Sequence, residues 1–356
     1  MDTTIEISNL TTGYKIKGGN KIISSNLNAH LYGSNLTCLL GPNGAGKSTL
    51  LRTLSAFQPA LEGNISVINK NLNQYKTAEL ARVVSVVLTD NSGIKNMTAE
   101  EVVSMGRSPY TGFWGKLTDK DKKIVDKCLT WVGISDLSQR KVHTLSDGEK
   151  QKVMIAKAIA QETPIIFLDE PTAFLDYPSK IGMMMLLHRL SKALNKTIFM
   201  STHDIEHALQ VADQIWLIDN EHGLTTGMPE DLCLNGSIDS YFANDIMSFD
   251  RTSATFSIHH ETARTVTVIA HKNSPEHILC CRALTRNGIQ PQPASSAADV
   301  PVAISIPGDG TFRLIEKGEE SLCVNKIEHL LKTVVPAITK HQITAIRAAA
   351  EMNQYE

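Results

Sequence analysis

The chain has 356 residues, which is enough for two domains of ordinary size. Hydrophobic residues make up 42% and charged residues 20%, so a large core can form and disorder is not indicated. The formal net charge of -2 argues against a nucleic-acid-binding protein, because such proteins carry a clustered basic excess. No run of about 18 apolar residues is present, so we expect no membrane-spanning helix.

The N-terminus and the cysteines indicate the compartment. The first six residues, Met1 to Glu6, are acidic and polar and lack the basic start and apolar run of a secretory signal. The cysteines are scattered without the CxxC spacing of metal sites, which favours reduced thiols in a cytosolic protein. They are Cys38, Cys128, Cys233, Cys280, Cys281 and Cys323.

Short β-like runs alternate with helical runs through the first 250 residues. The sequence predicts strands at Ile5–Leu10, Asn35–Leu40, Ala81–Leu88, Ile165–Asp169, Thr197–Ser201 and Gln214–Asp219. It predicts helices at Thr49–Ala56, Asp119–Val132, Asp147–Gln161 and Ser179–Leu194. Buried apolar strands that alternate with helices predict an α/β fold with a mainly parallel sheet, and ligands bind such sheets at the carboxyl ends of strands.

A change of pattern predicts a domain boundary near Asp250, after a last short helix at Ser237–Met247. Residues 251–356 then predict a small α+β domain, with a loose polar loop between Pro291 and Pro301. Its expected elements are strands at Ala254–Ile258 and Arg264–Ala270, a helix at Pro275–Arg286, a hairpin of Val300–Ile306 and Thr311–Glu316, and a helix at Ser321–Val334.

A glycine-rich loop that matches GxxxxGK[ST] stands between a predicted strand and a predicted helix. Its glycines let backbone N–H groups converge on phosphate oxygens, and the helix N-terminus adds a positive dipole. We expect Lys47 to reach the β- and γ-phosphates of ATP and Ser48 to ligate Mg²⁺. The alternative is a chance glycine turn. The expected ATP-binding residues are Gly41, Pro42, Asn43, Gly44, Ala45, Gly46, Lys47, Ser48 and Thr49.

The apolar strand at Ile165–Leu168 is followed by two carboxylates. Asp169, at the strand end, is placed to hold Mg²⁺ through water. Glu170, one residue further, would polarise the water that attacks the γ-phosphate. The alternative is a buried strand that ends in an acidic turn.

Further motifs resemble those of the ATP-binding-cassette (ABC) ATPases, over roughly residues 1 to 250. The resemblance implies a P-loop NTPase fold with a mainly parallel core sheet, an antiparallel β part and a helical subdomain at about residues 90–160. The motifs are Leu145–Glu149 (LSDGE, similar to the LSGGQ signature), Ala173–Asp176 (similar to the D-loop), Ser201–Asp204 (similar to the switch-histidine segment) and Tyr14 (similar to the aromatic residue that stacks on adenine).

In that family the signature of one chain caps the γ-phosphate of the nucleotide held by its partner. The resemblance therefore implies a dimer of this chain, in which Ser146, Gly148 and Glu149 act in trans. It also implies that His203 bonds the γ-phosphate and orients the water, beside Glu170 and Lys47 as the catalytic residues. The alternative for His203 is a packed or surface histidine, and we expect His207 to be structural.

Three residues depart from the family pattern. Asp147 replaces a glycine and Glu149 a glutamine of the signature. A carboxylate beside a triphosphate is unfavourable unless it turns to solvent or to a cation, and we favour solvated residues that stabilise the helix dipole. Thr89 stands at the Q-loop glutamine, so any Mg²⁺ contact from its short hydroxyl would run through water. The neighbouring Asp90 is a candidate substitute.

The segment Met105–Tyr110, with Phe113–Gly115 and Thr118–Asp121 after it, resembles the helical subdomain of ATPases from ferric-siderophore, haem and cobalamin importers. The resemblance implies the ATP-hydrolysing subunit of such an importer, peripheral at the cytoplasmic face of the inner membrane. Its implied partners are a second copy of the chain, two integral-membrane permease subunits and, indirectly, a substrate-binding protein. We expect Arg107 and Phe113 to face the permease, and the alternative is a generic surface loop.

The C-terminal domain carries residues of the kinds that bind transition metals or haem iron, namely His259, His260, His271, His277, Cys280 and Cys281. We favour a packing or dimerisation role over metal binding. Two rival classes remain. One is a non-transport cassette ATPase that acts on ribosomes or DNA, and the other is a regulator in which the C-terminal domain senses a ligand.

Overall fold

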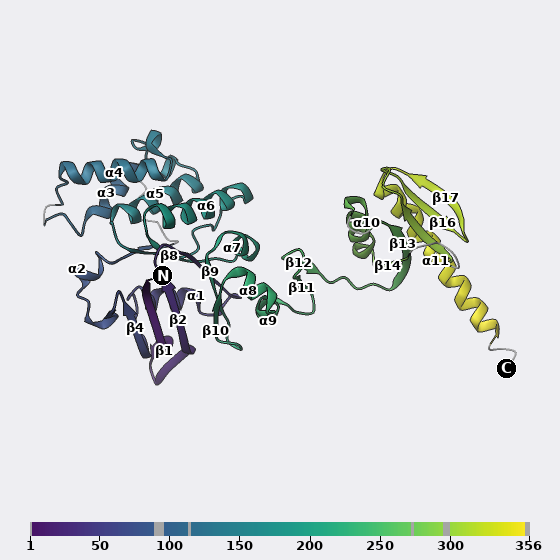
Figure 1. Cartoon of the computed structure of the whole chain (residues 1–356), viewed down its shortest axis with the longest axis horizontal. Helices are drawn as coiled ribbons and strands as arrows, with labels where there is room; N and C mark the ends of the chain where they lie inside the picture. Colours follow the sequence, from purple (N-terminus) through teal and green to yellow (C-terminus); the bar gives the residue numbers. More distant parts are fainter. Residues whose placement is uncertain (1, 89–95, 113–114, 272–273, 295–299, 353–356) are drawn as a thin grey trace. The chain divides into compact units, whose positions relative to one another are not determined.

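The computed structural model describes residues 2–88, 96–112, 115–271, 274–294 and 300–352 (Figure 1). Its contacts divide the chain into two compact units. The first comprises Met1–Asn244 and Ser248–Ser257, and the second comprises Asp245–Met247 and Ile258–Glu356. The division therefore falls beyond Asp250, where the sequence pattern changes.

The first unit is built around a six-stranded sheet of order β10-β9-β3-β8-β7-β6. All strands run parallel except β10, which pairs antiparallel with β9. The bounds are β3 (Leu36–Leu40), β6 (Val84–Val87), β7 (Ile165–Leu168), β8 (Thr197–Ser201), β9 (Gln214–Ile218) and β10 (Leu224–Gly227). The parallel strands are buried apolar runs because both faces of the sheet are covered. The prediction of an α/β fold with a mainly parallel sheet is confirmed.

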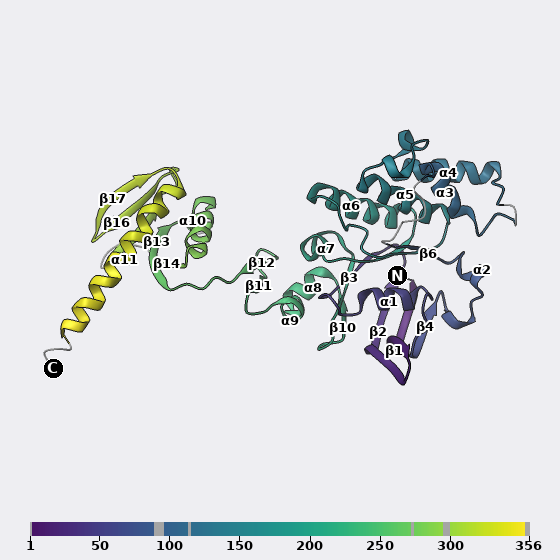
Figure 2. The same ribbon diagram turned by 180° about the vertical axis from the view of Figure 1, so that it is seen from behind.

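A four-stranded antiparallel sheet of order β2-β1-β4-β5 lies on one side of this core (Figure 2). Its strands are β1 (Thr3–Ile16), β2 (Gly19–Tyr32), β4 (Glu62–Val67) and β5 (Lys70–Asn71). The sequence predicts only part of β1 here, and β2, whose first four residues are exposed, was not predicted. Helix α1 (Lys47–Leu54) packs its leucines between the two sheets, together with Phe167, Phe199 and Trp216 of the parallel sheet.

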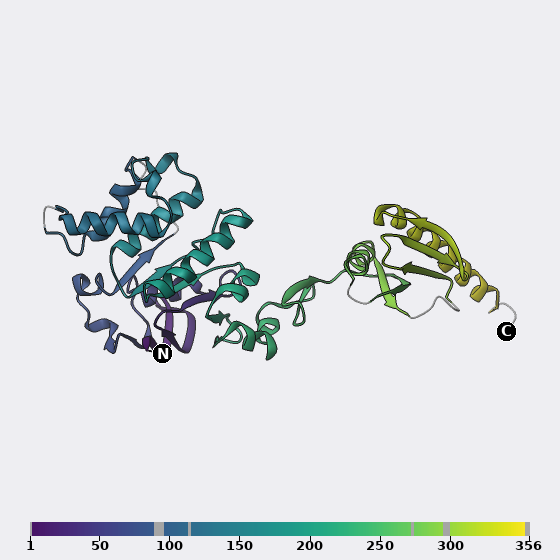
Figure 3. The same cartoon turned by 45° about the horizontal axis from the view of Figure 1, so that its top comes forward.

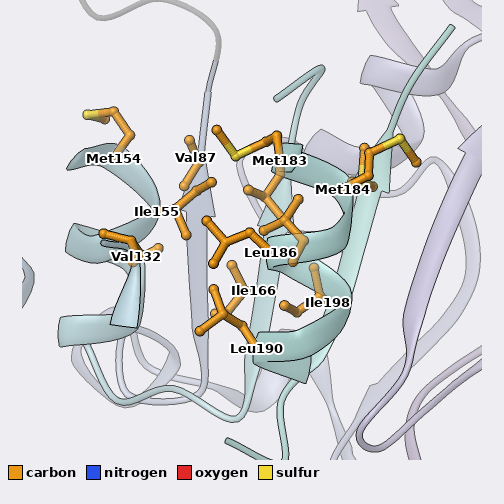
Figure 4. Packing of buried hydrophobic residues seen from close by; sticks show 14 of the residues in the cluster. Val87, Val132, Met154, Ile155, Ile166, Met183, Met184, Leu186, Leu190 and Ile198 are labelled. Atoms are coloured by element: carbon orange, nitrogen blue, oxygen red, sulfur yellow. The ribbon is translucent and has the colours of Figure 1, made fainter. Parts of the chain in front are cut away.

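Helices cover the other face of the parallel sheet. They are α3 (Ala99–Ser104), α4 (Asp119–Trp131), α5 (Asp147–Ala160), α6 (Tyr177–Ala193), α7 (Ile205–Val211), α8 (Pro229–Leu234) and α9 (Ser237–Phe242). Figure 4 shows Ile155 of α5 and Leu186 and Leu190 of α6 meeting Ile166 and Ile198 of the sheet. Three of these helices, α3, α4 and α5, pack on one another as a helical part of the unit (Figure 1). Short α2 (Thr77–Leu80) and the 3-10 turns η1 (Leu72–Gln74), η2 (Met105–Arg107), η3 (Ser135–Leu137) and η4 (Val142–Thr144) complete the connections.

The helix predicted at Ser237–Met247 is too long. Helix α9 ends at Phe242, and Met247 begins a hairpin of β11 (Met247–Asp250) and β12 (Thr255–Ile258). The ring of Phe249 lies 5.2 Å from that of Phe256, and both rings pack against the helix-covered core. Burial of these aromatic rings outweighs the local tendency to continue the helix.

The second unit has a five-stranded sheet of order β14-β13-β15-β16-β17. Helices α10 and α11 both pack on the sheet face that carries Val268, Ile304 and Leu314, and Figure 3 shows α11 along the strands. The bounds are β13 (Arg264–Ala270), α10 (Pro275–Arg286), β14 (Ile289–Pro293), β15 (Val302–Ile306), β16 (Phe312–Glu316), β17 (Glu319–Val324) and α11 (Ile327–Met352).

Two predictions for this unit are wrong. The helix predicted at Ser321–Val334 is a strand, β17, followed by a separate helix that begins at Ile327. Leu322 and Val324 alternate onto the covered sheet face, so pairing with β16 wins over helix propensity. The loop predicted from Pro291 is strand β14 as far as Pro293.

The part of the chain that the structure describes contains no helix that is long and apolar enough to cross a lipid bilayer.

Candidate nucleotide site

The glycine loop follows β3, whose five residues are all buried, and leads into α1. A Cβ atom on Gly41 would lie 2.1 Å from the carbonyl oxygen of Ile218 in β9, so only glycine allows this close approach. Gly46 has a φ of 92°, in the left-handed region, and a Cβ there would also meet Ile23 at 2.6 Å. The loop therefore presents bare backbone at the start of a helix, where N–H groups and the helix dipole favour an anion.

Lys47 extends back across the loop that precedes it. Its Nζ donates to the carbonyl oxygens of Gly41, at 2.7 Å, and Pro42, at 3.1 Å. Burial lowers the pKa of the Lys47 ammonium, while the carboxylates of Glu170 and Asp169 act in the opposite direction. The ammonium is thus held at the loop, close to both carboxylates.

The ends of β7 and β8 bring together the acidic residues and the histidine. Ser201 Oγ donates to Asp169 Oδ1 at 2.7 Å, and the Glu170 N–H donates to Ser201 Oγ at 2.9 Å. Ser48 Oγ donates to the same Asp169 oxygen at 3.3 Å. His203 Nε2 lies 2.7 Å from Glu170 Oε1, and both side chains are partly exposed. One cluster therefore links the loop helix to the carboxyl ends of two strands.

Ser201 is a residue of this cluster to which the sequence assigned no role of its own. It ends the buried strand β8, and it holds Asp169 through its side chain and Glu170 through the backbone. A polar residue at the carboxyl end of an apolar strand is the signal that points to it.

Tyr14, on β1, lies beside the loop helix. Its hydroxyl is 3.0 Å from Thr49 Oγ1, and 41% of the residue is exposed. The structure thus places an exposed aromatic residue next to the phosphate loop.

Residues Ser146 to Glu149 form the start of α5. Ser146 caps the helix through a reciprocal pair with Glu149, and Asp147 Oδ1 pairs with Lys150 Nζ at 2.9 Å. The Asp147 carboxylate is thus exposed to solvent and also pairs with a cation. Among the described residues, no hydrogen bond joins this segment to the glycine loop of the same chain.

Some predicted residues lie elsewhere or outside the described part. Thr89 and Asp90 fall outside the described residues, as does Phe113. Arg107 does not face outward, because only 3% of it is exposed. It binds Asp121, Glu162 and the carbonyl of Ala160 inside the helical part, so the prediction that it docks a permease is wrong.

The histidines and cysteines of the second unit are not gathered. Among the described residues, no group of three or more His, Cys, Asp or Glu side chains is arranged to hold a metal ion. Cys280 is buried in the core of the unit, and burial raises the pKa of its thiol to about 12.

A glycine loop between a buried strand and a helix, faced by two carboxylates at the end of β7, which pairs with β8 on the other side of that strand from β3, defines a P-loop nucleotide hydrolase. The ABC transporter family model matches residues 24–173. An uncharacterized ABC transporter ATP-binding protein of Methanocaldococcus jannaschii is 40% identical over 228 residues, which are 64% of this chain and 77% of the relative. The iron(3+)-hydroxamate import ATP-binding protein FhuC of Bacillus subtilis is 35% identical over 190 residues, which are 53% of this chain and 71% of the relative.

A solved dimeric structure of a bacterial ABC transporter cassette has a TM-score of 0.56 and 27% identity, over 63% of this chain and 98% of that chain. The chain therefore belongs to the ABC transporter family, as one of its ATP-binding, ATP-hydrolysing subunits. The family, the fold class and the enzyme class predicted from the sequence are confirmed.

Proposed function

We propose that this chain is the ATP-hydrolysing subunit of an importer for an iron–siderophore, haem or cobalamin-type substrate. The observation that carries the ATPase role is the contact of His203 with Glu170, next to Asp169 and the glycine loop. The relative named for iron(3+)-hydroxamate import supports an iron chelate as the substrate. The segment Met105–Asp121, with its likeness to siderophore, haem and cobalamin importers, supports the same substrate class.

The nine residues from Gly41 to Thr49 would hold the phosphates, and Tyr14 would stack on the adenine. Lys47 would exchange its two loop carbonyls for β- and γ-phosphate oxygens, which offer a stronger, charged acceptor. Glu170 would polarise the attacking water, and His203, bonded to it at 2.7 Å, would orient that water and contact the γ-phosphate.

The donor set fits Mg²⁺. Ser48 Oγ and Asp169 Oδ1 already converge to 3.3 Å, and a hydroxyl and a carboxylate are the hard oxygen ligands that this ion prefers. We propose that Ser48 and Asp169 hold it, the carboxylate through water, and any contact from Thr89, which lies outside the described residues, would run only through water. When bound, the ion would neutralise charge on the β- and γ-phosphates.

The second half of each nucleotide site would come from a second copy of the chain, through Ser146 and Gly148, with the carboxylate of Glu149 beside the donors of Ser146. The dimeric structure of a related cassette supports this arrangement. The other proposed partners are two integral-membrane permease subunits and, through them, a substrate-binding protein. The chain would then act as a peripheral protein at the cytoplasmic face of the inner membrane.

Single-turnover hydrolysis tests the catalytic assignment. The Glu170→Gln variant should bind Mg-ATP as tightly as wild type and should hydrolyse it about 100-fold more slowly or worse, because the amide cannot polarise the water. Both quantities would be measured on the purified full chain with radiolabelled ATP. An unchanged rate in the variant, or no hydrolysis by the wild type even with its permease, would contradict the proposal.

A further inference from the structure

The first turn of α5 contains a contact that engages both hydrogen-bond donors of Ser146. Its backbone N–H and its Oγ–H donate to the same oxygen, Glu149 Oε2, each at 2.8 Å. The Glu149 N–H in turn donates to Ser146 Oγ at 3.3 Å. A hydroxyl has one proton to give, so while this contact stands Ser146 has no donor left for another anion.

Glu149 carries a negative charge in this contact. Hydrogen bonds from the backbone and the side chain of Ser146 lower the pKa of its carboxyl, and the nearby charges of Arg140 and Lys152 lower it further. Asp147, in the same turn, differs because its carboxylate pairs with Lys150 at 2.9 Å and faces solvent. Of the two carboxylates in this turn, the one that occupies the donors of Ser146 is therefore that of Glu149.

We propose that the Glu149 carboxylate competes with the partner chain's nucleotide for the two donors of Ser146, and so weakens closure of the dimer. The inference rests on the proposed function, in which Ser146 of one chain contacts the γ-phosphate bound by the other. Carboxylate and phosphate oxygens are both anionic acceptors for N–H and O–H groups, so they exclude each other at these donors. Like charge adds a repulsion as the phosphate approaches.

The released carboxylate has a place to go. A hollow of about 410 Å³ lies beside the start of α5 and is lined by Ser146, Glu149, Lys152 and Arg189, among others. Lys152 follows Glu149 by three residues, which places the two side chains on the same helix face. If the Glu149 carboxylate moved from the Ser146 donors to the Lys152 ammonium, both donors of Ser146 would become available and the charge of Glu149 would stay compensated.

A matched control exists at the start of α3. Thr98 N donates to Glu101 Oε2 at 2.7 Å, and Glu101 N donates to Thr98 Oγ1 at 3.2 Å. This reciprocal cap has the same two backbone contacts as that of α5, and it lies outside the proposed nucleotide site. Glutamine also serves at this position of a capping box, so Glu149→Gln and Glu101→Gln each remove one charge and keep a helix cap.

The test measures dimerisation of the full chain by sedimentation, with Mg²⁺ and the non-hydrolysable analogue AMP-PNP, in wild type, Glu149→Gln and Glu101→Gln. At low salt we expect the dimer of Glu149→Gln to be about tenfold tighter than that of wild type, and that of Glu101→Gln to be unchanged. Because salt screens repulsion between exposed charges, the difference should shrink as ionic strength rises. A dimer no tighter than wild type in Glu149→Gln, or an equal gain in Glu101→Gln, overturns the inference.

The nucleotide affinity of dilute, monomeric protein distinguishes a failure of the proposed ATP-binding function from a failure of the competition by Glu149. Glu149 is proposed to act only on the partner's nucleotide, so all three proteins should bind a fluorescent ATP analogue equally. A wild-type chain that binds no nucleotide overturns the proposed function, and the inference with it. Equal nucleotide binding together with an unchanged dimer constant overturns the competition alone.

Discussion

Arg107 is the residue whose structural environment differs most from its expected role. Its guanidinium binds Asp121 at 2.9 Å, the Ala160 carbonyl at 2.7 Å and Glu162 at 2.7 Å, and it lies over the ring of Tyr110. Hydrogen bonds from Thr118, and then from Arg107, lower the pKa of the buried Asp121 carboxyl to about 2. Arg107 therefore compensates a buried charge that joins α4 to the end of α5.

Removal of this guanidinium should destabilise the first unit. Arg107→Ala leaves the Asp121 carboxylate buried with Thr118 as its hydrogen-bond partner among the described residues, which should cost about 3 kcal/mol of the free energy of unfolding. Urea unfolding monitored by tryptophan fluorescence would measure it. Lys122→Ala is the control, because the Lys122–Asp119 pair is exposed and should contribute less than about 0.5 kcal/mol. An Arg107→Ala protein as stable as wild type would contradict the role of Arg107 in compensating the Asp121 charge.

For single residues, the sequence predicts which of the proposed site residues lie together, but it does not predict which side chains are buried. The glycine loop, Asp169 and Glu170 were predicted from their motifs and His203 from the family resemblance, and the structure places them in one cluster. The burial of Arg107 depends on Asp121 and Glu162, which approach it only after α4 and α5 have packed. No local pattern around Met105–Tyr110 contains that information.

At the scale of elements, Gly106 controls how closely the segment after α3 approaches α5. A Cβ atom on Gly106 would lie 2.2 Å from the carbonyl oxygen of Lys157, in the backbone of α5. Gly106→Ala must therefore push the two elements apart, and we expect a loss of about 2 kcal/mol of stability in thermal or urea unfolding.

Gly182, on α6, provides the opposite case. A Cβ there meets nothing within 4 Å, and the residue is helical. Gly182→Ala should therefore raise stability by up to about 1 kcal/mol, through helix propensity alone. If Gly106→Ala raised the stability as Gly182→Ala does, close packing between Gly106 and the backbone of α5 would be contradicted.

Helices and strands were predictable where the apolar residues of a segment form one buried run or follow one helical period. The buried strands β7 and β8 and the amphipathic helices α4 and α5 lie within one or two residues of their predicted bounds. Strand β17 (Glu319–Val324) was not predicted, because only Leu322 and Val324 show the alternation of a strand. The apolar residues Leu330 and Leu331 belong to the helix that follows, so the whole segment resembles one helix in sequence. Such a short edge strand is determined by pairing with β16, which local sequence does not reveal.

At the scale of the whole molecule, the β11–β12 hairpin belongs with the nucleotide-binding unit. The Phe256 N–H donates to Glu206 Oε1 at 3.2 Å, on α7, the helix that begins two residues after His203. Phe256 also packs its ring against Phe242 and Phe249. The hairpin is thus attached to the element that follows the switch-type histidine, although the sequence pattern changes near Asp250, before the hairpin ends.

Two truncated chains test whether the nucleotide-binding unit ends at Ser257, as its contacts indicate, or at Asp250, where the sequence pattern changes. A chain of residues 1–257 keeps the hairpin except Ile258 and should bind nucleotide and unfold at the same urea concentration as the first unit of the full chain. A chain of residues 1–250 lacks Phe256 and exposes Phe249, which is 6% exposed in the full chain, so it should lose about 2 kcal/mol. The difference should remain when Glu206→Ala is introduced into 1–257, because that variant removes one hydrogen bond and leaves the aromatic contacts. Equal stability of 1–250 and 1–257 would show that the hairpin contributes nothing to the nucleotide-binding unit, and that this unit is complete at Asp250.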